Sequence, residues 1–151
     1  MNEIPAKSIM TSVLLVPTLV ATIVALSGCT PAPAPASTPT GQTYQALADV
    51  GQTVYSNTCA VCHGNDGKPA NKYTVLLWGP GSTIGTYYGI TLFTNAQEML
   101  DYMSKTMPLA ASGSLSDQQY SALLAYILTQ AGIVSPSTVF DESKLSSISI
   151  P

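Results

Sequence analysis

The stretch that most constrains this 151-residue chain is Cys59-Ala60-Val61-Cys62-His63. Two cysteines separated by two residues, with a histidine directly after the second, have the spacing for c-type haem attachment. In such a site each sulfur bonds to a vinyl group and the imidazole binds the iron from one face. We therefore predict one covalent haem c, attached through Cys59 and Cys62, with His63 as an axial ligand.

Other chemistries fit this motif less well. Tetrahedral zinc needs four nitrogen or sulfur ligands, whereas the whole chain has three cysteines, one of them the distant Cys29, and one histidine. A thioredoxin-like dithiol opens a helix within a βαβ pattern, but here a helical period leads into the cysteines and no such alternation follows. Two buried cysteines beside a chance histidine remain the non-functional alternative.

Met107 is the candidate for the second axial ligand. Pro108 follows it directly, so a helix should end there and the thioether should lie in extended chain. Met99 and Met103 are instead expected to fill the core. If Met107 leaves the iron readily, the chain is a haem-based gas sensor or a small haem catalyst with a displaceable methionine, and this alternative stays open.

The N-terminal residues 1–28 have the features of a targeting segment. An apolar run from Ile9 to Leu26 follows Lys7, and small residues stand directly before Cys29, which resembles the lipobox of bacterial lipoproteins. We expect Cys29 to carry lipid and the protein to sit on the outer, periplasmic or extracytoplasmic face of the cytoplasmic membrane. The alternative is an uncleaved membrane helix, for which 18 residues are just long enough. Residues 29–43 then form a Pro/Ala-rich tether.

Charge is scarce in this sequence. Only 9% of residues are charged, there is no arginine, and the formal net charge is −3. A nucleic-acid partner is excluded because phosphate binding needs a basic patch. Long-range electrostatic steering towards a partner should also be weak.

Residues 44–133 are predicted to form the folded domain, with three main helices. The first helix leads to Cys59 and carries an apolar stripe made of Tyr44, Leu47, Ala48, Gly51 and Tyr55. The second helix begins at Asn95, with Glu98 as its capping partner. The third helix is capped by Ser116 and Gln119, and its apolar stripe consists of Tyr120, Leu123, Leu124, Ile127, Leu128 and Ala131. We expect the third helix to cross the first near Gly51 and Tyr55.

The segments between and after these helices show no clean period. We expect residues 64–94 to wrap the haem, with pocket lining from Leu76, Leu77, Trp78, Ile84, Tyr87, Tyr88, Ile90, Leu92 and Phe93. Lacking arginine, the chain would offer Trp78, tyrosines, Lys68, Lys72 or backbone amides to the haem propionates. The tail, residues 134–151, is expected to be disordered unless its apolar residues dock on a partner.

These residues resemble class I cytochromes c over about positions 44–132. The matching pieces are Gly51-Gln52-Thr53-Val54-Tyr55, Cys59-Ala60-Val61-Cys62-His63-Gly64, Leu77-Trp78-Gly79-Pro80, and Met107-Pro108-Leu109 followed by the helix with Tyr126. The resemblance implies a small all-α fold with about three main helices around one haem, axial His63 and Met107, and thioether links at Cys59 and Cys62. Val75 stands where the family commonly has a proline whose carbonyl accepts the proximal histidine N–H.

The function expected from these features is single-electron transfer by a membrane-anchored carrier, not catalysis by the chain itself. Its partners would be a redox donor and acceptor of a respiratory or photosynthetic chain. It would act as a shuttle or as a fixed subunit of a quinol-oxidising complex such as alternative complex III. The low charge and the apolar tail favour the fixed subunit.

Overall fold

The computed structural model describes residues 41–69 and 74–151. The predicted targeting segment, Cys29, most of the tether and Lys72 lie outside these ranges. Within them, no helix combines the length and the apolar character that a membrane span requires.

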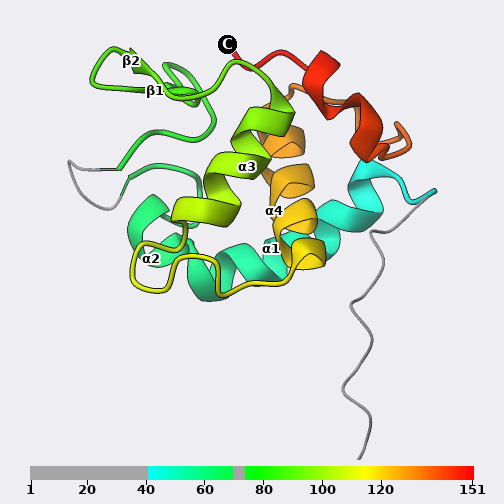
Figure 1. Ribbon diagram of the computed structural model, residues 1–151, viewed down its shortest axis with the longest axis horizontal. Coiled ribbons are helices and arrows are strands. Elements are labelled where there is room, and N and C mark those ends of the chain that lie inside the picture. The colour runs from blue at the N-terminus through cyan, green and yellow to red at the C-terminus, as the bar shows by residue number, and fades with distance from the viewer. Residues whose placement is uncertain (1–40, 70–73) are drawn as a thin grey trace, which may run out of the picture. The chain divides into compact units, whose positions relative to one another are not determined.

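Three helices make up the body of the domain, α1 (Tyr44–Thr58), α3 (Ala96–Thr106) and α4 (Asp117–Gln130), as Figure 1 shows. The shorter elements are α2 (Ala60–His63), an antiparallel pair of two-residue strands, β1 (Thr86–Tyr87) and β2 (Ile90–Thr91), and the 3-10 helix η1 (Glu142–Ser147). The predicted small all-α fold with three main helices is therefore confirmed. The short hairpin was not expected.

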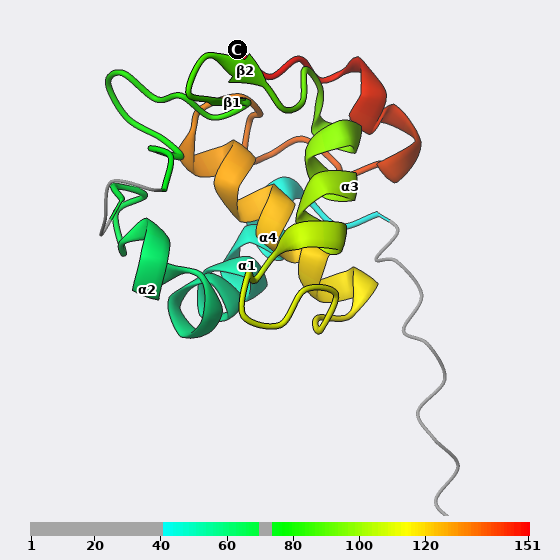
Figure 2. The ribbon, with the colours of Figure 1, turned by 60° about the vertical axis from the view of Figure 1, so that its left-hand side comes forward.

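Helices α1 and α4 form the closest packing in the domain. Tyr44, Leu47, Ala48, Gly51 and Tyr55 are the buried residues of α1, as the apolar stripe predicts. A Cβ placed on Gly51 would lie 2.0 Å from the carbonyl oxygen of Ala122, so the two backbones touch at this point. The predicted crossing near Gly51 and Tyr55 is confirmed, since Gly51 approaches Ala122 and Tyr55 packs against Tyr126. Figure 2 shows α1 and α4 crossing.

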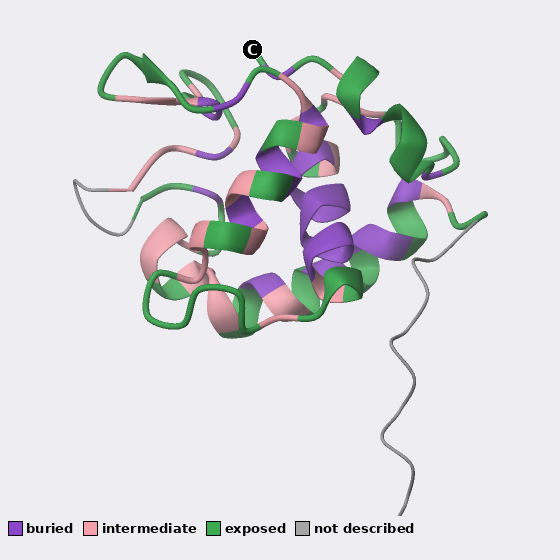
Figure 3. Ribbon diagram, in the orientation of Figure 1, coloured by how far each residue is buried: buried purple, intermediate pink, exposed green. Residues whose placement is uncertain are grey.

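Helix α4 is the most buried element of the described chain (Figure 3). Burial extends beyond the predicted stripe to Ser121, Ala122, Ala125 and Tyr126, because α1 and α3 both pack against this helix. The predicted capping box is present: the Ser116 hydroxyl accepts from the Gln119 N–H, and the Gln119 side chain accepts from the Ser116 N–H.

Helix α3 begins and ends close to the predicted positions. The Asn95 side chain caps it by accepting from the Glu98 N–H at 3.0 Å. Glu98 returns its carboxylate to the N–H and hydroxyl of Thr94, one residue earlier than a capping box would place it. At the other end, Met107 is the C-cap residue in extended conformation, directly before Pro108.

The tail does not follow the expectation of disorder. Phe140, Leu145 and Ile150 are buried in the same core as the helices, and residues 142–147 form η1. Backbone hydrogen bonds join the tail to the first residues of α1 and α3 and to the residues just before them. The prediction of a disordered tail is wrong, because these apolar side chains dock on their own domain.

Candidate haem site

A cavity of about 300 Å³ lies between α1, α2, α3, α4 and the chain before α3. Cys59, Cys62, His63 and Met107 all line it. The other lining side chains are mostly apolar and come from every main element: Tyr55, Val75, Leu77, Tyr87, Leu92, Phe93, Met99, Tyr102, Met103, Leu109, Leu115, Tyr120, Leu123 and Ile127. The structure thus brings together the four residues that the sequence singles out in positions 59–107.

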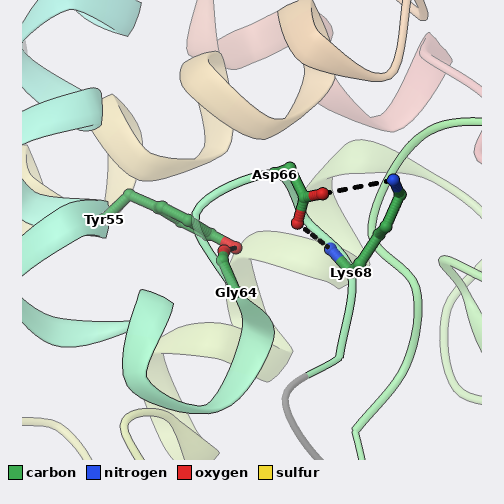
Figure 4. A network of polar contacts seen from close by, with 4 residues as sticks. All are labelled: Tyr55, Gly64, Asp66 and Lys68. Carbon is green, nitrogen blue, oxygen red and sulfur yellow. Dashed lines mark hydrogen bonds and ion pairs between the residues drawn. The ribbon is translucent and has the colours of Figure 1, made fainter.

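The end of α1 positions the two cysteines. The Cys59 N–H donates to Tyr55 O at 2.8 Å, so the helix continues up to the first thiol before the chain turns into α2. The Tyr55 hydroxyl donates to Gly64 O at 2.7 Å, so α1 is also bonded to the residue that follows His63 (Figure 4). Gly64 has φ +72°, a conformation that glycine adopts without strain.

Cys59 and Cys62 are both free, half-buried thiols. Burial, with the neighbouring Cys62 as a smaller cause, raises the pKa of Cys59 to about 11. This side chain is therefore protonated at neutral pH. Two free thiols with two residues between them, on the wall of an apolar cavity, suit covalent attachment to a large apolar group.

His63 is the last residue of α2 and is also half-buried. Burial lowers its pKa, and the Val75 backbone, acting as a hydrogen-bond acceptor, opposes this shift. The buried Nδ1 atom of His63 nonetheless makes no well-formed hydrogen bond with the residues that the structure describes. The neutral imidazole favoured by burial is the form that binds metal ions. The Val75 backbone lies where the resemblance expects an acceptor.

Met107 is held by its backbone on both sides. Its N–H donates to Met103 O at 2.9 Å, which ends α3, and its carbonyl oxygen accepts from the Tyr120 hydroxyl at 2.7 Å. The predicted helix end and extended chain at this residue are confirmed. The sequence pattern predicts only a core position for Tyr120; the signal for its second role is its hydroxyl in an otherwise apolar stripe.

The predicted lining of the cavity is partly wrong. Leu77, Tyr87, Leu92 and Phe93 line it as expected, whereas Leu76, Trp78, Ile84, Tyr88 and Ile90 do not. Trp78 instead packs on Tyr55 and Tyr126, with ring centroids 5.3 and 5.7 Å away, and Ile84 joins the core. Tyr88 and Ile90 lie at the hairpin and are 73% and 64% exposed.

Two of the proposed propionate donors also lie off the cavity. Trp78 is engaged in the ring cluster, and Lys68 forms an exposed ion pair with Asp66 at 3.2 Å (Figure 4). Among the tyrosines that the structure describes, Tyr55, Tyr87, Tyr102 and Tyr120 line the cavity. The hydroxyls of Tyr55 and Tyr120 already donate to backbone carbonyl oxygens, so Tyr102 is a better-placed candidate donor than Lys68.

The donor set fits a c-type haem. One imidazole, one thioether and two free thiols line a single apolar cavity. Imidazole and thioether are the axial ligands found in cytochromes c, and paired thiols are the groups that attach the porphyrin.

A comparison with solved structures supports the fold. The chain has the fold of a chain in the sulfane dehydrogenase SoxCD from Paracoccus pantotrophus, with a TM-score of 0.55 and 22% identity. The match covers 76% of this chain and 61% of that chain, so the chain spans less than two thirds of this neighbour. A comparison with curated proteins finds no match.

A family model covers most of the chain and includes every lining residue of the cavity. Its description is cytochrome c oxidase, cbb3-type, subunit III, and it matches residues 31–127. Members of a c-type cytochrome family carry covalent haem and exchange electrons with redox partners. Because the match spans well over half of the sequence, this chain belongs to the cbb3-type subunit III family of c-type cytochromes.

Proposed function

We propose that this cytochrome carries one haem, attached through Cys59 and Cys62 and ligated axially by His63 and Met107, and that it transfers single electrons at the membrane surface. The observation that carries this proposal is the meeting of these four side chains on one cavity. When bound there, haem supplies the one-electron couple between ferrous and ferric iron.

The chain's own contribution is ligand choice, burial and orientation. A thioether ligand favours ferrous iron, and an apolar pocket disfavours the extra charge of the ferric state, so both raise the reduction potential. The Tyr55 hydroxyl fixes the backbone at Gly64, the residue after His63. The Tyr120 hydroxyl fixes the backbone of Met107 itself. The cavity is lined largely by apolar side chains from all four α-helices, which limit the access of water.

Covalent attachment is tested on the protein purified from its natural source. After unfolding and extraction with acidic organic solvent, the haem is expected to stay with the polypeptide, because thioether bonds survive this treatment. Pigment that leaves the chain would overturn the proposal. The haem-to-protein ratio in the same sample tests the single haem.

Carbon monoxide distinguishes the electron carrier from a gas sensor or small catalyst. The reduced wild-type protein is expected to bind it slowly or not at all, because the Met107 thioether would already hold the iron. Met107→Leu should bind it rapidly. Met103→Leu is the matched control, since Met103 lines the same cavity one turn earlier on α3. Rapid binding by the wild type would favour the sensor.

The placement of the protein rests on the N-terminal sequence. Cys29 follows an apolar run and small residues, the arrangement of a lipidation site, and we propose that lipid at this cysteine holds the domain on the outer face of the cytoplasmic membrane. An uncleaved N-terminal membrane helix would give the same location.

Within this function we favour a fixed subunit of a quinol-oxidising complex, such as alternative complex III, over a free shuttle. The tail does not support this choice, because Phe140, Leu145 and Ile150 are buried in the domain. Support comes from the low charge and from Leu109, which borders the cavity and is 75% exposed. Reduction by the natural donor should then depend weakly on ionic strength; a steep decrease with salt would favour the shuttle.

A further inference from the structure

The two helices that lead to His63 and Met107 end at the cavity, and the first residues of both helices contact the C-terminal tail. Helix α1 leads through α2 to His63, and α3 ends directly before Met107. Residues 134–151, which we call the clasp, contact the beginnings of both helices. Figures 1 and 2 show this segment, coloured orange to red, running from the start of α1 to the start of α3.

The first half of the clasp binds the start of α1. The N–H groups of Tyr44 and Gln45 donate to Thr138 O and Pro136 O, each at 2.9 Å. These are N-terminal helix donors, which have no partner within the helix. In return the Phe140 N–H donates to Gln42 O at 2.7 Å, and its ring packs edge-on against Tyr44 at 5.3 Å.

The second half binds the start of α3. The Ala96 N–H donates to Ile148 O at 2.9 Å, and the Ile150 N–H donates to Thr94 O at 2.8 Å. Between the two halves, Leu145 of η1 is fully buried, with 0% exposure. The clasp is therefore fixed to the core between its two contacts, and it joins two helices that are distant in sequence.

The end of the clasp also supports the cavity wall. A Cβ placed on Gly85 would lie 3.1 Å from Ile150 Cγ2 and 3.1 Å from Phe93 O, so Ile150 packs directly against this glycine. Gly85 and Phe93 line the cavity, and Gly85 O accepts from the Leu92 N–H at 2.7 Å. Phe93 in turn packs against Tyr102 of α3, with ring centroids 5.7 Å apart.

We propose that the clasp is a positioning element that sets where Met107 lies relative to His63, and so how firmly Met107 is retained as a ligand. This inference rests on the ligand assignment made under the proposed function. Two kinds of contact carry it: the backbone hydrogen bonds to the start of α3, and the packing of the Ile150 side chain behind the cavity wall. The family match ends at residue 127, so the clasp lies outside the part of the chain that the family model describes.

The test is the rate at which carbon monoxide binds to the reduced holoprotein, because binding requires Met107 to leave the iron. Ile150→Ala should raise this rate about tenfold, since it removes the packing against Gly85 and lowers the free energy of local opening. Ile150→Val keeps Cγ2 and should give a smaller rise. Val139→Ala is the matched control: Val139 belongs to the clasp but is 55% exposed, and its rate should equal that of the wild type.

Unfolding by denaturant, measured on the same samples, separates positioning from stability alone. If Ile150→Ala and Ile150→Val are fully folded and bind carbon monoxide at the wild-type rate, the clasp only stabilises the domain and the inference is overturned. If Ile150→Ala does not fold, Ile150→Val decides by the same criterion. Fast binding by the wild type itself would instead contradict the assignment of Met107, which is the failure of the proposed function.

Discussion

The Tyr120 hydroxyl donates a 2.7 Å hydrogen bond to the carbonyl oxygen of Met107. Tyr120 is 3% exposed and lies near the start of α4, the helix that is buried against both α1 and α3. The Met107 N–H is bonded to Met103 O within α3. The backbone of Met107 is therefore hydrogen-bonded to both α3 and α4, and the bond from Tyr120 links the end of α3 to α4.

Removing this hydroxyl should loosen Met107. Tyr120→Phe leaves the ring in place but removes the partner of the Met107 carbonyl oxygen, at a cost of about 1–3 kcal/mol where such a group stays unsatisfied. We expect a lower free energy of unfolding and faster carbon monoxide binding to the reduced protein. Tyr126→Phe is the control, because it makes the same change in α4 away from the cavity. Equal binding rates in both variants would contradict this role for Tyr120.

The contact between Gly51 and Ala122 predicts a strong effect of a single methyl group. In Gly51→Ala the new Cβ would lie 2.0 Å from Ala122 O and 2.9 Å from Tyr126 Cβ, so α1 and α4 must move apart. Overpacking of this kind typically costs about 1–3 kcal/mol, although alanine favours the helix. Denaturant unfolding should show a lower midpoint than for Gln52→Ala, an exposed neighbour. A midpoint at or above the wild-type value would contradict the close approach.

The helices could be predicted from the sequence because their signals are local. Apolar residues at helical spacing fix the buried face of α1, and the Ser116–Gln119 box fixes the start of α4. The haem-attachment motif is also local, because its two cysteines and its histidine lie within the five residues 59–63. Pro108 gives a local reason for the end of α3, and this places Met107 in extended chain at the cavity.

The long-range partners could not be predicted in the same way. Nothing near Tyr120 in sequence indicates that its hydroxyl binds the Met107 carbonyl. Trp78 looked like pocket lining because it is large and apolar, but its ring fills the space above Gly67 and beside Tyr55. The tail looked disordered because Ser and Pro dominate it, although a few apolar residues suffice when a core is there to receive them.

The proposed lipid anchor predicts a change in where the protein is found. Cys29→Ser removes the thiol that would carry the lipid, so the cytochrome should move from the membrane fraction to the soluble extracytoplasmic fraction. Its absorption spectrum should stay the same, because the substitution lies far in sequence from residues 59–107. A variant that remains in the membrane fraction would indicate a membrane-spanning segment or a protein partner. Cell fractionation with spectroscopy makes this measurement.

The start of α3 predicts a dependence of stability on pH. The Glu98 carboxylate accepts hydrogen bonds from the Thr94 N–H and hydroxyl at 2.8 and 3.0 Å, and these hold the pKa of Glu98 below its usual range. Because the pKa is lower in the folded state, the stabilisation is present above the unfolded-state pKa and is lost as pH falls through the folded-state pKa. Glu98→Gln should therefore be less stable than the wild type at neutral pH, and the difference should shrink below about pH 4.

Glu142→Gln is the control for this measurement, since the exposed Glu142 side chain makes no hydrogen bond within the described residues. Its unfolding free energy should follow that of the wild type over the same pH range. Comparing each variant with the wild type at the same pH cancels the effect of acid on haem ligation, which all three proteins share. A constant difference between Glu98→Gln and the wild type from neutral pH to pH values below about 4 would show that the bonds to Thr94 do not depend on the charge of Glu98.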